Sequence, residues 1–441
     1  METPAPVSPE DRTSASALRE PETDPRDKGR TGKAKKSPPV YNYEDGESGE
    51  KPAVVTVNGK TEPAKEAPFK PAKPGDLSKV PTAKPLPKDA SLGDLGLEIV
   101  FLDVGQADAI LIVGPKGTLL IDAGEVTQKQ SQSKNFLKIK DKLYEMTGRN
   151  HLDYFVPSHY HVDHMGSARS GNGIWGLLDE GVTVGAIVDR GDFFFGAERP
   201  GGWKTFPESV QGWIASGIVG KRVTAKVGTG QIDLGEGITV EVVAVNGNGV
   251  LEKKDQQNIG YFDKCPPSEN DYSVVLKISV GNFEFFTAGD LSGEDVERKF
   301  GKSCQSYNDI ETYIAAKTGD VELFKVTHHG SEHSNNELML TTLDPEVSVI
   351  PSGGGYNHPA QLVAKRLIET SMTLDTGGFS PKEWPSGGPS EIPVVGDIIV
   401  QVVAGGGKYA VKYATQTDLF RSYSDAEEAK ELDQKNAPLG K

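Results

Sequence analysis

The sequence has little cysteine, no long apolar run and no mark of export. Cys265 and Cys304 are the only cysteines among 441 residues, which argues against a disulfide framework and favours a reducing compartment. No run approaches the roughly 18 apolar residues of a membrane-spanning helix. The N-terminus, METPAPVSPEDR, lacks the charged and apolar regions of a signal peptide. We expect a soluble, cytoplasmic protein with no membrane partner, although non-standard export routes leave no such mark.

Positive charge is scarce outside the N-terminal region. The net charge is −15, and residues 1–92 hold 16 basic and 15 acidic residues, so the other 349 residues carry about −16. Nucleic-acid binding depends on Lys and Arg side chains that neutralise phosphates. The acidic remainder therefore disfavours a long phosphate-binding groove, and a short or small substrate is expected instead.

Aromatic residues are nearly absent from residues 1–92, which contain three of them together with 15 of the 29 prolines. Such a composition cannot bury enough apolar surface to offset chain entropy. We predict a disordered arm over residues 1–92, which could bind a protein partner. The alternative is a small folded module near 52–59, PAVVTVNG, where a strand-like run ends in an Asn-Gly turn.

Residues 93–420 have the pattern of one α/β body, followed by a charged tail at 421–441. Short runs rich in Ile, Val and Leu between glycine-containing turns predict buried strands. Helices are expected at 133–148, near Gly293 and at 360–370. Strands at both ends with helices between them imply sheets covered by helices. The expected strands are 97–102, 109–113, 118–121, 152–158, 184–188 and 322–327, with others between 223 and 288, after 346 and at 397–414.

Histidine is also scarce, yet three of the eight histidines lie in SHYHVDHMGS, residues 158–167. His159 and His161 follow a predicted strand at positions i and i+2, so both imidazoles point the same way. Asp163 and His164 come as the chain turns. Imidazole suits zinc, copper, iron and nickel, and added carboxylates broaden the choice toward manganese; we expect zinc, with manganese as the alternative. Four ligand-type side chains in six residues exceed the needs of one cation, which indicates two adjacent metal ions.

The HxHxDH pattern after a strand resembles the signature of the metallo-β-lactamase superfamily. The flanking segments are similar to one branch, the hydrolase domain of the competence protein ComEC, over roughly 97–360. This resemblance implies a four-layer αββα sandwich and a hydrolase. It also implies that Asp122, in LIDAG, steadies a metal ligand. The segments that carry it are FLDVGQADAILI, LLIDAG, SHYHVDHMGS, SVVLKI, FFTAGDL, FKVTHHGS and NHP.

The resemblance also implies a set of ligands at the matching positions. Asp290, in TAGDL, would bridge the two metals. Either His328 or His329, in THHGS, would complete the second site, and His328 is preferred because it ends the strand first. Asp163, Asp290 and His358 would take catalytic roles, with His358 close to the substrate. The remaining implied ligands are His159 and His161 for the first metal, and Asp163 and His164 for the second.

The chain departs from the family pattern at three points. Many members have a further histidine ligand before the bridging aspartate, but this chain has none between residues 165 and 327. Asp189 is our candidate for that role, with Asp192 as the alternative. Ala107 replaces a glycine, and His333 replaces a small hydroxyl residue at the substrate rim or in solvent. Seven of the eight histidines thus fall in these motifs, and His151 is read as a surface residue.

Two divalent cations about 3.5–4 Å apart lower the pKa of a bridging water and stabilise developing negative charge. The predicted function is therefore hydrolysis of phosphodiester bonds in nucleic acid or nucleotides. One alternative is a phosphocholine-type or other small-ester hydrolase. Another is a scaffold whose arm binds a partner. The glycine-rich loop at 351–359 is either an anion cradle or an ordinary flexible loop, and its Tyr356 contacts the substrate or simply packs.

Overall fold

The first unit of the chain contains one described hairpin. The structure is a computed structural model that describes residues 54–57, 60–63, 93–124, 134–193, 202–257, 265–300, 303–354, 356–379 and 390–423. The chain divides into Met1–Lys70 and Pro71–Lys441. In the first unit, β1 (Val54–Val57) pairs antiparallel with β2 (Lys60–Pro63). The strand considered at 52–59 is therefore present. The rest of the predicted arm, and the tail from residue 424, lie outside the described residues.

The larger sheet of the second unit has nine strands in the order β20-β19-β18-β3-β4-β5-β6-β7-β8. The strands from β5 to β8 run parallel, and the others pair antiparallel. Apolar residues on both faces of these strands mean that both faces of the sheet are covered. The strands are β3 (Leu95–Phe101), β4 (Ile110–Val113), β5 (Thr118–Ile121), β6 (His151–Val156), β7 (Thr183–Asp189), β8 (Val219–Thr224), β18 (Ile398–Val403), β19 (Tyr409–Tyr413) and β20 (Gln416–Phe420).

The second sheet has seven strands in the order β17-β16-β15-β12-β11-β10-β9. Here β12, β15, β16 and β17 run parallel, so their carboxyl ends meet at one edge. The strands are β9 (Gly228–Thr229), β10 (Ile238–Ala244), β11 (Val275–Val280), β12 (Phe283–Thr287), β15 (Leu323–Lys325), β16 (Val347–Ile350) and β17 (Met372–Asp375).

The two sheets pack face to face through one apolar core. Alternate residues of β3, Leu97, Ile99 and Phe101, join this core, while Val100 points to the opposite face of the sheet. Phe101 meets Phe285 of β12 edge to face, with ring centroids 5.6 Å apart. The period-two alternation of the strands thus builds the inter-sheet layer.

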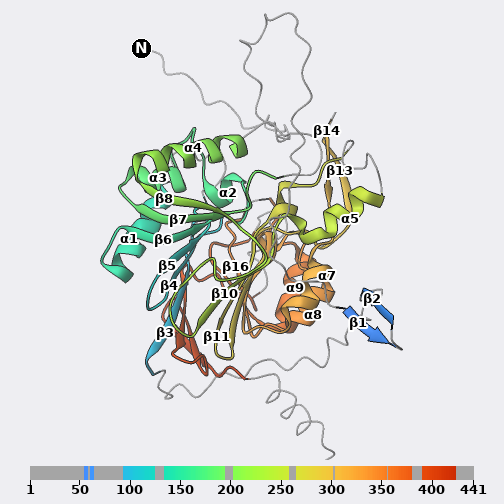
Figure 1. The fold of residues 1–441 in the computed structure, drawn as a ribbon. Helices are drawn as coiled ribbons and strands as arrows, with labels where there is room; N and C mark the ends of the chain where they lie inside the picture. Colours follow the sequence, from blue (N-terminus) through green and yellow to red (C-terminus); the bar gives the residue numbers. More distant parts are fainter. Residues whose placement is uncertain are drawn as a thin grey trace, which may run out of the picture. The chain divides into compact units, whose positions relative to one another are not determined.

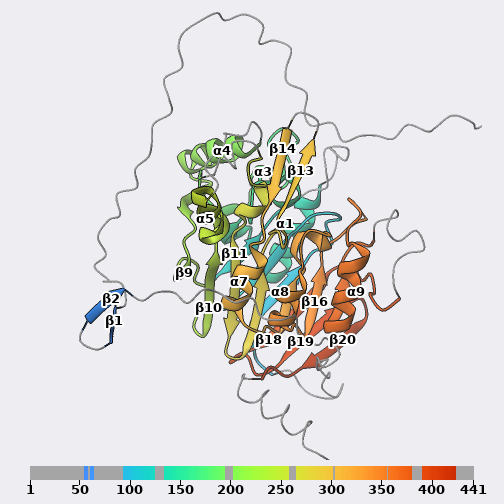
Figure 2. The same ribbon diagram turned by 90° about the vertical axis from the view of Figure 1, so that its right-hand side faces the viewer.

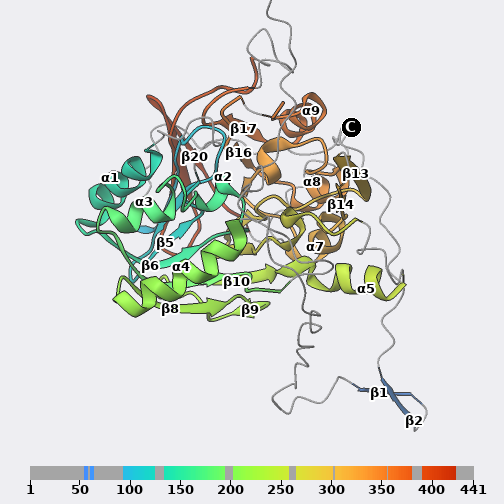
Figure 3. The same ribbon diagram turned by 90° about the horizontal axis from the view of Figure 1, so that it is seen from above.

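Helices cover the outer faces of both sheets, which Figures 1 and 3 show as two separate helical layers. The buried residues Phe136, Ile139 and Leu143 of α1 recur at spacings of three and four, as in an amphipathic helix. Gly148 ends α1 in the left-handed conformation, as predicted. The helices are α1 (Asn135–Thr147), α3 (Ile174–Asp179) and α4 (Gly202–Ser216) on the larger sheet, and α7 (Glu311–Thr318), α8 (Glu337–Leu343) and α9 (Gln361–Thr370) on the other. The four layers confirm the predicted αββα sandwich.

The helix expected near Gly293 is wrong. The chain instead forms an antiparallel hairpin of β13 (Val296–Phe300) and β14 (Ser303–Tyr307), drawn in Figure 2 as two long arrows. Half-buried Val296 and Arg298 alternate with exposed Glu297 and Lys299, a period of two that favours a strand. A helix follows only at Glu311, where α7 begins.

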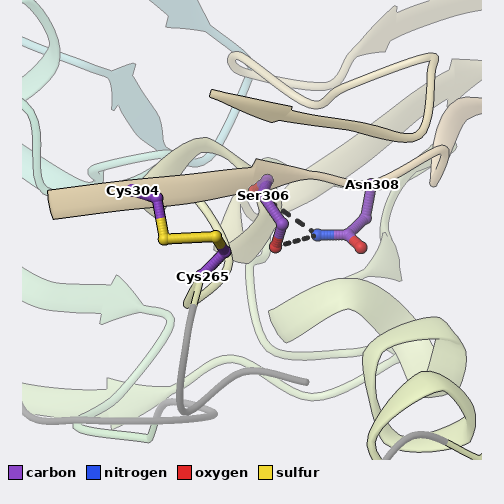
Figure 4. Close-up of a disulfide and its surroundings, with 4 residues drawn as sticks. All are labelled: Cys265, Cys304, Ser306 and Asn308. Carbon is purple, nitrogen blue, oxygen red and sulfur yellow. Dashed lines mark hydrogen bonds between the residues drawn. A yellow bond between two sulfur atoms is a disulfide. The ribbon is translucent and has the colours of Figure 1, made fainter. Parts of the chain in front are cut away.

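The two cysteines are joined, which corrects the expectation drawn from their small number. Cys265 and Cys304 form a disulfide with Cα atoms 4.9 Å apart, shown in Figure 4. They are 39 residues apart in the sequence, and they meet because the segment after Cys265 lies along β14, with Pro267 opposite Ser306. Ser306 of β14 also bonds the backbone of Pro266 and Ser268. The disulfide thus fastens the segment that leads into the short helix η4 (Glu269–Tyr272).

Candidate metal centre

The histidine loop follows β6 and is held tightly against its neighbours. His161 precedes the short helix α2 (Val162–Met165), so the chain turns between the pair His159 and His161 and the pair Asp163 and His164. The N–H of Asp108 donates to the carbonyl of Asp163 at 3.0 Å. A Cβ on Gly124 would lie 1.7 Å from that same carbonyl oxygen, so only glycine permits this approach.

His159 and His161 face each other, as their i and i+2 spacing predicts. The Nε2 of His159 lies 2.9 Å from the Nδ1 of His161, and Ser158 Oγ lies 3.1 Å from the Nδ1 of His159. His159 is fully buried, and burial lowers its pKa well below the usual value. A neutral imidazole offers the lone pair that a metal ion needs.

A second group of ligand atoms converges on Asp290, which follows β12. One ligand atom each from Asp163, His164, Asp290 and His329 lies within 4.8 Å of the others. The Oδ2 of Asp290 is 3.2 Å from the Nε2 of His164, and the Nε2 of His329 is 3.5 Å from the Oδ2 of Asp163. Side chains from the ends of β6, β12 and β15 therefore meet at one point, although up to 166 residues separate them in the sequence.

Two imidazoles of this group, those of His164 and His329, use Nδ1 to bond a partner outside the group. The Nδ1 of His164 bonds Asp122 Oδ2 at 2.9 Å, and the Nδ1 of His329 donates to the carbonyl of Pro351 at 2.7 Å. Each Nε2 therefore points toward Asp290, and neither makes a hydrogen bond within the described part of the chain. Such outer partners orient imidazole ligands in metal sites. The role predicted for Asp122 matches this geometry.

The charges of the group are strongly coupled. Burial alone would lower the pKa of His164, but Asp290, Asp122 and Asp108 outweigh it and raise that pKa well above its usual value. Burial would raise the pKa of Asp290, but His164, His328 and His329 hold it well below its usual range. A cation at this point would take the place of the proton on the imidazole, so metal binding would release protons.

The backbone angles of His328 and His329 direct the two side chains to different places. Both His328 and His329 adopt left-handed angles, with φ of 52° and 51°, in η5 (Thr327–Gly330). His329 turns into the group with Asp163, whereas the Nε2 of His328 lies 3.6 Å from Asp290 Oδ2 and its side chain is partly exposed. Both therefore approach Asp290, but it is His329, not the preferred His328, that joins the four-residue group.

His358 lies next to both His328 and His329. Its ring centroid is 5.3 Å from that of His328. Burial, followed by repulsion from His328 and His329, lowers the pKa of His358 to about 3. Its Nδ1 is buried and makes no hydrogen bond within the described residues. At neutral pH His358 is thus an uncharged group with a hydrogen-bonding atom to offer.

The sequence comparisons agree with this architecture. Residues 102–249 match the sequence model of the metallo-beta-lactamase superfamily. The body of the chain has the metallo-β-lactamase fold. ComE operon protein 3 of Bacillus subtilis (strain 168) is 25% identical over 291 residues, 63% of this chain and 31% of that protein. Recombination protein 2 of Haemophilus influenzae is 24% identical over 115 residues, 26% of this chain and 13% of that protein.

The chain spans less than a third of the length of either curated relative, 31% and 13%. Among solved structures it is similar to the metallo-beta-lactamase fold protein YhfI of Bacillus subtilis, with a TM-score of 0.36, 12% identity and coverage of 64% and 97%. It is also similar to a diphosphatase of the PhnP family, with a TM-score of 0.35, 9% identity and coverage of 70% and 99%. The match to the family model and the likeness to ComE operon protein 3 agree with the predicted family and branch.

Asp189 does not lie in the candidate metal centre. Asp189 ends β7 and is fully buried, but Arg222 binds both of its oxygens, at 2.7 and 3.1 Å. The N–H of Gly191 donates to it as well, at 2.8 Å. Asp192 is exposed and also pairs with Arg222. Both candidates for the missing ligand are therefore paired with Arg222. The sequence could not show this, because an aspartate at the end of a strand looks the same whichever group neutralises it.

Two further sequence predictions are resolved by contacts. In the loop 351–359, the N–H of Gly353 already donates to Gln106 Oε1 at 3.0 Å, so it is not free to bind an anion. His333 is not simply in solvent. It stacks on Tyr307 with centroids 5.3 Å apart and pairs with Glu294 and Glu332. His151 lies half-exposed on β6 beside Thr183.

Three residues of the site were not assigned a role from the sequence. Asp108 lies beside His329, with Oδ1 3.3 Å from Nδ1. Lys325 is buried and pairs with Asp108. Asn270 in η4 places its amide nitrogen 3.4 Å from the ring of His328. A lysine within the apolar run ELFKVT was a usable signal, because a charge in a buried strand requires a partner.

Proposed function

We propose that the domain is a metal-dependent hydrolase that cleaves phosphodiester bonds in nucleic acid or nucleotides. The convergence of His164 Nε2, His329 Nε2 and Asp163 on Asp290 carries this proposal. These residues fit a divalent cation, because the two nitrogens are buried without a hydrogen bond among the described residues. Zinc suits the imidazoles, and the carboxylates make manganese the alternative.

The residues divide between two ions. Asp163, His164, Asp290 and His329 would hold one, and His159 with His161 would hold the other beside Asp290, with His328 close to both. When bound, a pair of divalent ions lowers the pKa of a water molecule between them and stabilises charge on a phosphoryl oxygen. Asp290 would be shared by the two sets of ligands. Asp163 and Asp290 would orient the attacking water by accepting its hydrogen bonds.

His358 would act on the substrate side. Because its pKa is lowered to about 3, it is neutral at pH 7 and would bind a phosphate oxygen by donating a hydrogen bond rather than by charge. A role as general acid would need a protonated imidazole near neutral pH, which this environment opposes.

The deciding experiment is metal analysis of the purified chain together with a substrate panel. The panel contains bis(p-nitrophenyl) phosphate, single- and double-stranded DNA and cyclic nucleotides. We expect bound zinc or manganese and cleavage of at least one of these substrates, with both lost in Asp290→Ala. Asp233→Asn, at an exposed ion pair with Lys116, serves as the control that keeps both. A metal-loaded protein that leaves every substrate intact would sink the proposal.

A small-ester hydrolase, such as a phosphocholine-type esterase, is the second candidate. The negative charge of the residues after position 92 favours a small substrate over a long polyanion. Activity that persists in high salt would favour this candidate, because extended nucleic-acid contacts are screened by salt.

The arm and the location of the protein are separate questions. We propose that residues 1–92 bind a protein partner, and their deletion should change partner binding while hydrolysis is retained. Among the described residues, none of the helices is long and apolar enough to cross a bilayer. The small number of cysteines was one ground for expecting a cytoplasmic location, and the Cys265–Cys304 disulfide removes that ground.

A further inference from the structure

A lysine lies beneath the metal centre. Lys325 is the last residue of β15, between β12 and β16 in the middle of the seven-stranded sheet. Its side chain has no exposed surface. Among the described residues it is the only buried lysine. A buried ammonium group loses its hydration, so it persists only where carboxylates or carbonyls surround it.

The partners of Lys325 are groups of the metal centre. Its Nζ pairs with Asp108 Oδ2, lies 3.7 Å from Asp290 Oδ1 and donates to the carbonyl of Gly289 at 3.0 Å. The other oxygen of each aspartate faces an imidazole. Asp290 Oδ2 is 3.2 Å from the Nε2 of His164, and Asp108 Oδ1 is 3.3 Å from the Nδ1 of His329. Lys325 therefore takes one oxygen of each carboxylate and leaves the other toward the histidines.

The ammonium group of Lys325 offsets part of the negative charge of the aspartates around the two histidines. Four buried or half-buried aspartates surround His164 and His329, and they would repel one another if no cation were near. We propose that Lys325 is a positioning residue that acts as a permanent counter-ion, holding Asp290 in its ligand orientation and Asp108 beside His329 when metal is absent. This inference rests on the proposed metal centre, but not on the identity of the substrate.

The proposal predicts that loss of Lys325 harms the metal-free protein more than the metal-loaded one. Without the lysine, Asp108 and Asp290 are left as buried carboxylates with no nearby ammonium group. Bound divalent ions supply positive charge to the same carboxylates, so they compensate for its loss. An ordinary structural ion pair would contribute equally in both forms.

The test compares the thermal midpoints of the full chain, metal-loaded and chelator-treated, in wild type and Lys325→Met. We expect the metal-free variant to lose on the order of 10 °C, and the metal-loaded variant to lose less than half as much. Lys277→Met is the matched control. Lys277 pairs with Glu284 at 2.9 Å on β11 of the same sheet, outside the cluster, and its loss should be the same in both forms. Equal losses for Lys325→Met in the two forms would overturn the proposal.

A second variant covers the case in which Lys325→Met does not fold. Lys325→Met with Asp108→Asn removes the lysine and one of its carboxylates together, so the metal-free protein should regain at least half of the lost thermal midpoint. A double variant that is no more stable than Lys325→Met, or that does not fold, contradicts the proposal. If the wild-type chain binds no metal, the proposed function fails, whereas recovery by Asp108→Asn still decides the role of Lys325.

Discussion

Two buried aspartates follow buried strands of this domain, and they have opposite surroundings. Asp189, at the end of β7, receives Arg222 on both oxygens and a backbone N–H besides. Asp290, after β12, has Oδ1 3.7 Å from the Nζ of Lys325 and Oδ2 within 3.8 Å of three imidazoles. The Nε2 atoms of His164 and His329, which face Asp290, make no hydrogen bond among the described residues. A buried polar group left unsatisfied requires an explanation, and a ligand supplies one.

The same contrast separates two regions around the histidine loop. The closed network consists of Tyr160, Asp189, Arg190, Arg222 and Glu269. In it, Arg190 donates to both oxygens of Glu269 at 2.8 Å, and the N–H of Tyr160 donates to Glu269 as well. The open cluster consists of Asp108, Asp163, His164, Asp290 and His329. The closed network stabilises the loop, and the open cluster is built to bind. Each prediction below tests that division.

The largest effect is expected from the two aspartates themselves. Asp290→Asn should remove bound metal and lower hydrolysis by on the order of 10³-fold, because the ligand common to both ions is lost. Asp189→Asn should keep its metal and most of its activity. Elemental analysis and initial rates on the same preparations measure both outcomes. The division fails if Asp189→Asn loses metal as completely as Asp290→Asn.

The closed network should govern stability instead of metal content. Arg190→Met leaves Glu269 buried without its guanidinium partner, so the free energy of unfolding, measured in denaturant, should fall by about 3–5 kcal/mol. Metal content per folded molecule should not change. As a control, Lys116→Met breaks an exposed pair with Asp233 and should leave stability nearly unchanged. Loss of metal in folded Arg190→Met would place the network in the metal centre.

Asp122 tests the border between the two regions. Asp122→Asn removes the carboxylate that fixes the Nδ1 of His164, so metal affinity should fall by about 10- to 100-fold. Competition with a chromophoric chelator gives this number directly. Unchanged affinity in the variant would mean that Ser158, 3.2 Å from the same nitrogen, is enough to orient the ring.

The smallest expected effect concerns pH. Burial lowers the pKa of His358 to about 3, against about 6.5 when the chain is unfolded. Between these values the unfolded chain binds a proton that the folded chain does not, so stability is complete above about pH 6.5 and falls toward pH 3. In metal-free protein, His358→Gln should make this decline shallower by on the order of 1 kcal/mol per pH unit. Identical slopes in denaturant titrations at pH 4, 5 and 6 would show that His358 is not responsible.

The sequence was sufficient for features that depend on local spacing. The i and i+2 positions of His159 and His161 after a strand determine their orientation, and apolar alternation placed most strands. It was insufficient where distant contacts decide. Asp189 and Asp290 both come at or after the end of a buried strand, and the sequence does not show that Arg222 binds the first. Likewise, the left-handed turns at His328 and His329 determine which histidine joins Asp163, and positive φ is uncommon enough outside glycine that the sequence did not predict it.

The predictions for the cysteines and for the segment after Gly293 are wrong for a related reason. Two cysteines 39 residues apart suggest no pairing until the β13–β14 hairpin between them is known. That hairpin occupies the place where a helix was expected. One error in local structure therefore concealed a covalent link.

The ligand residues come from both halves of the sandwich, with His164 following a strand of the nine-stranded sheet and Asp290 and His329 following strands of the other. Neither half alone can retain an ion in this way. Uptake of metal during refolding should thus coincide with the docking of the two halves, and a signal from cobalt or manganese would time that last step of assembly.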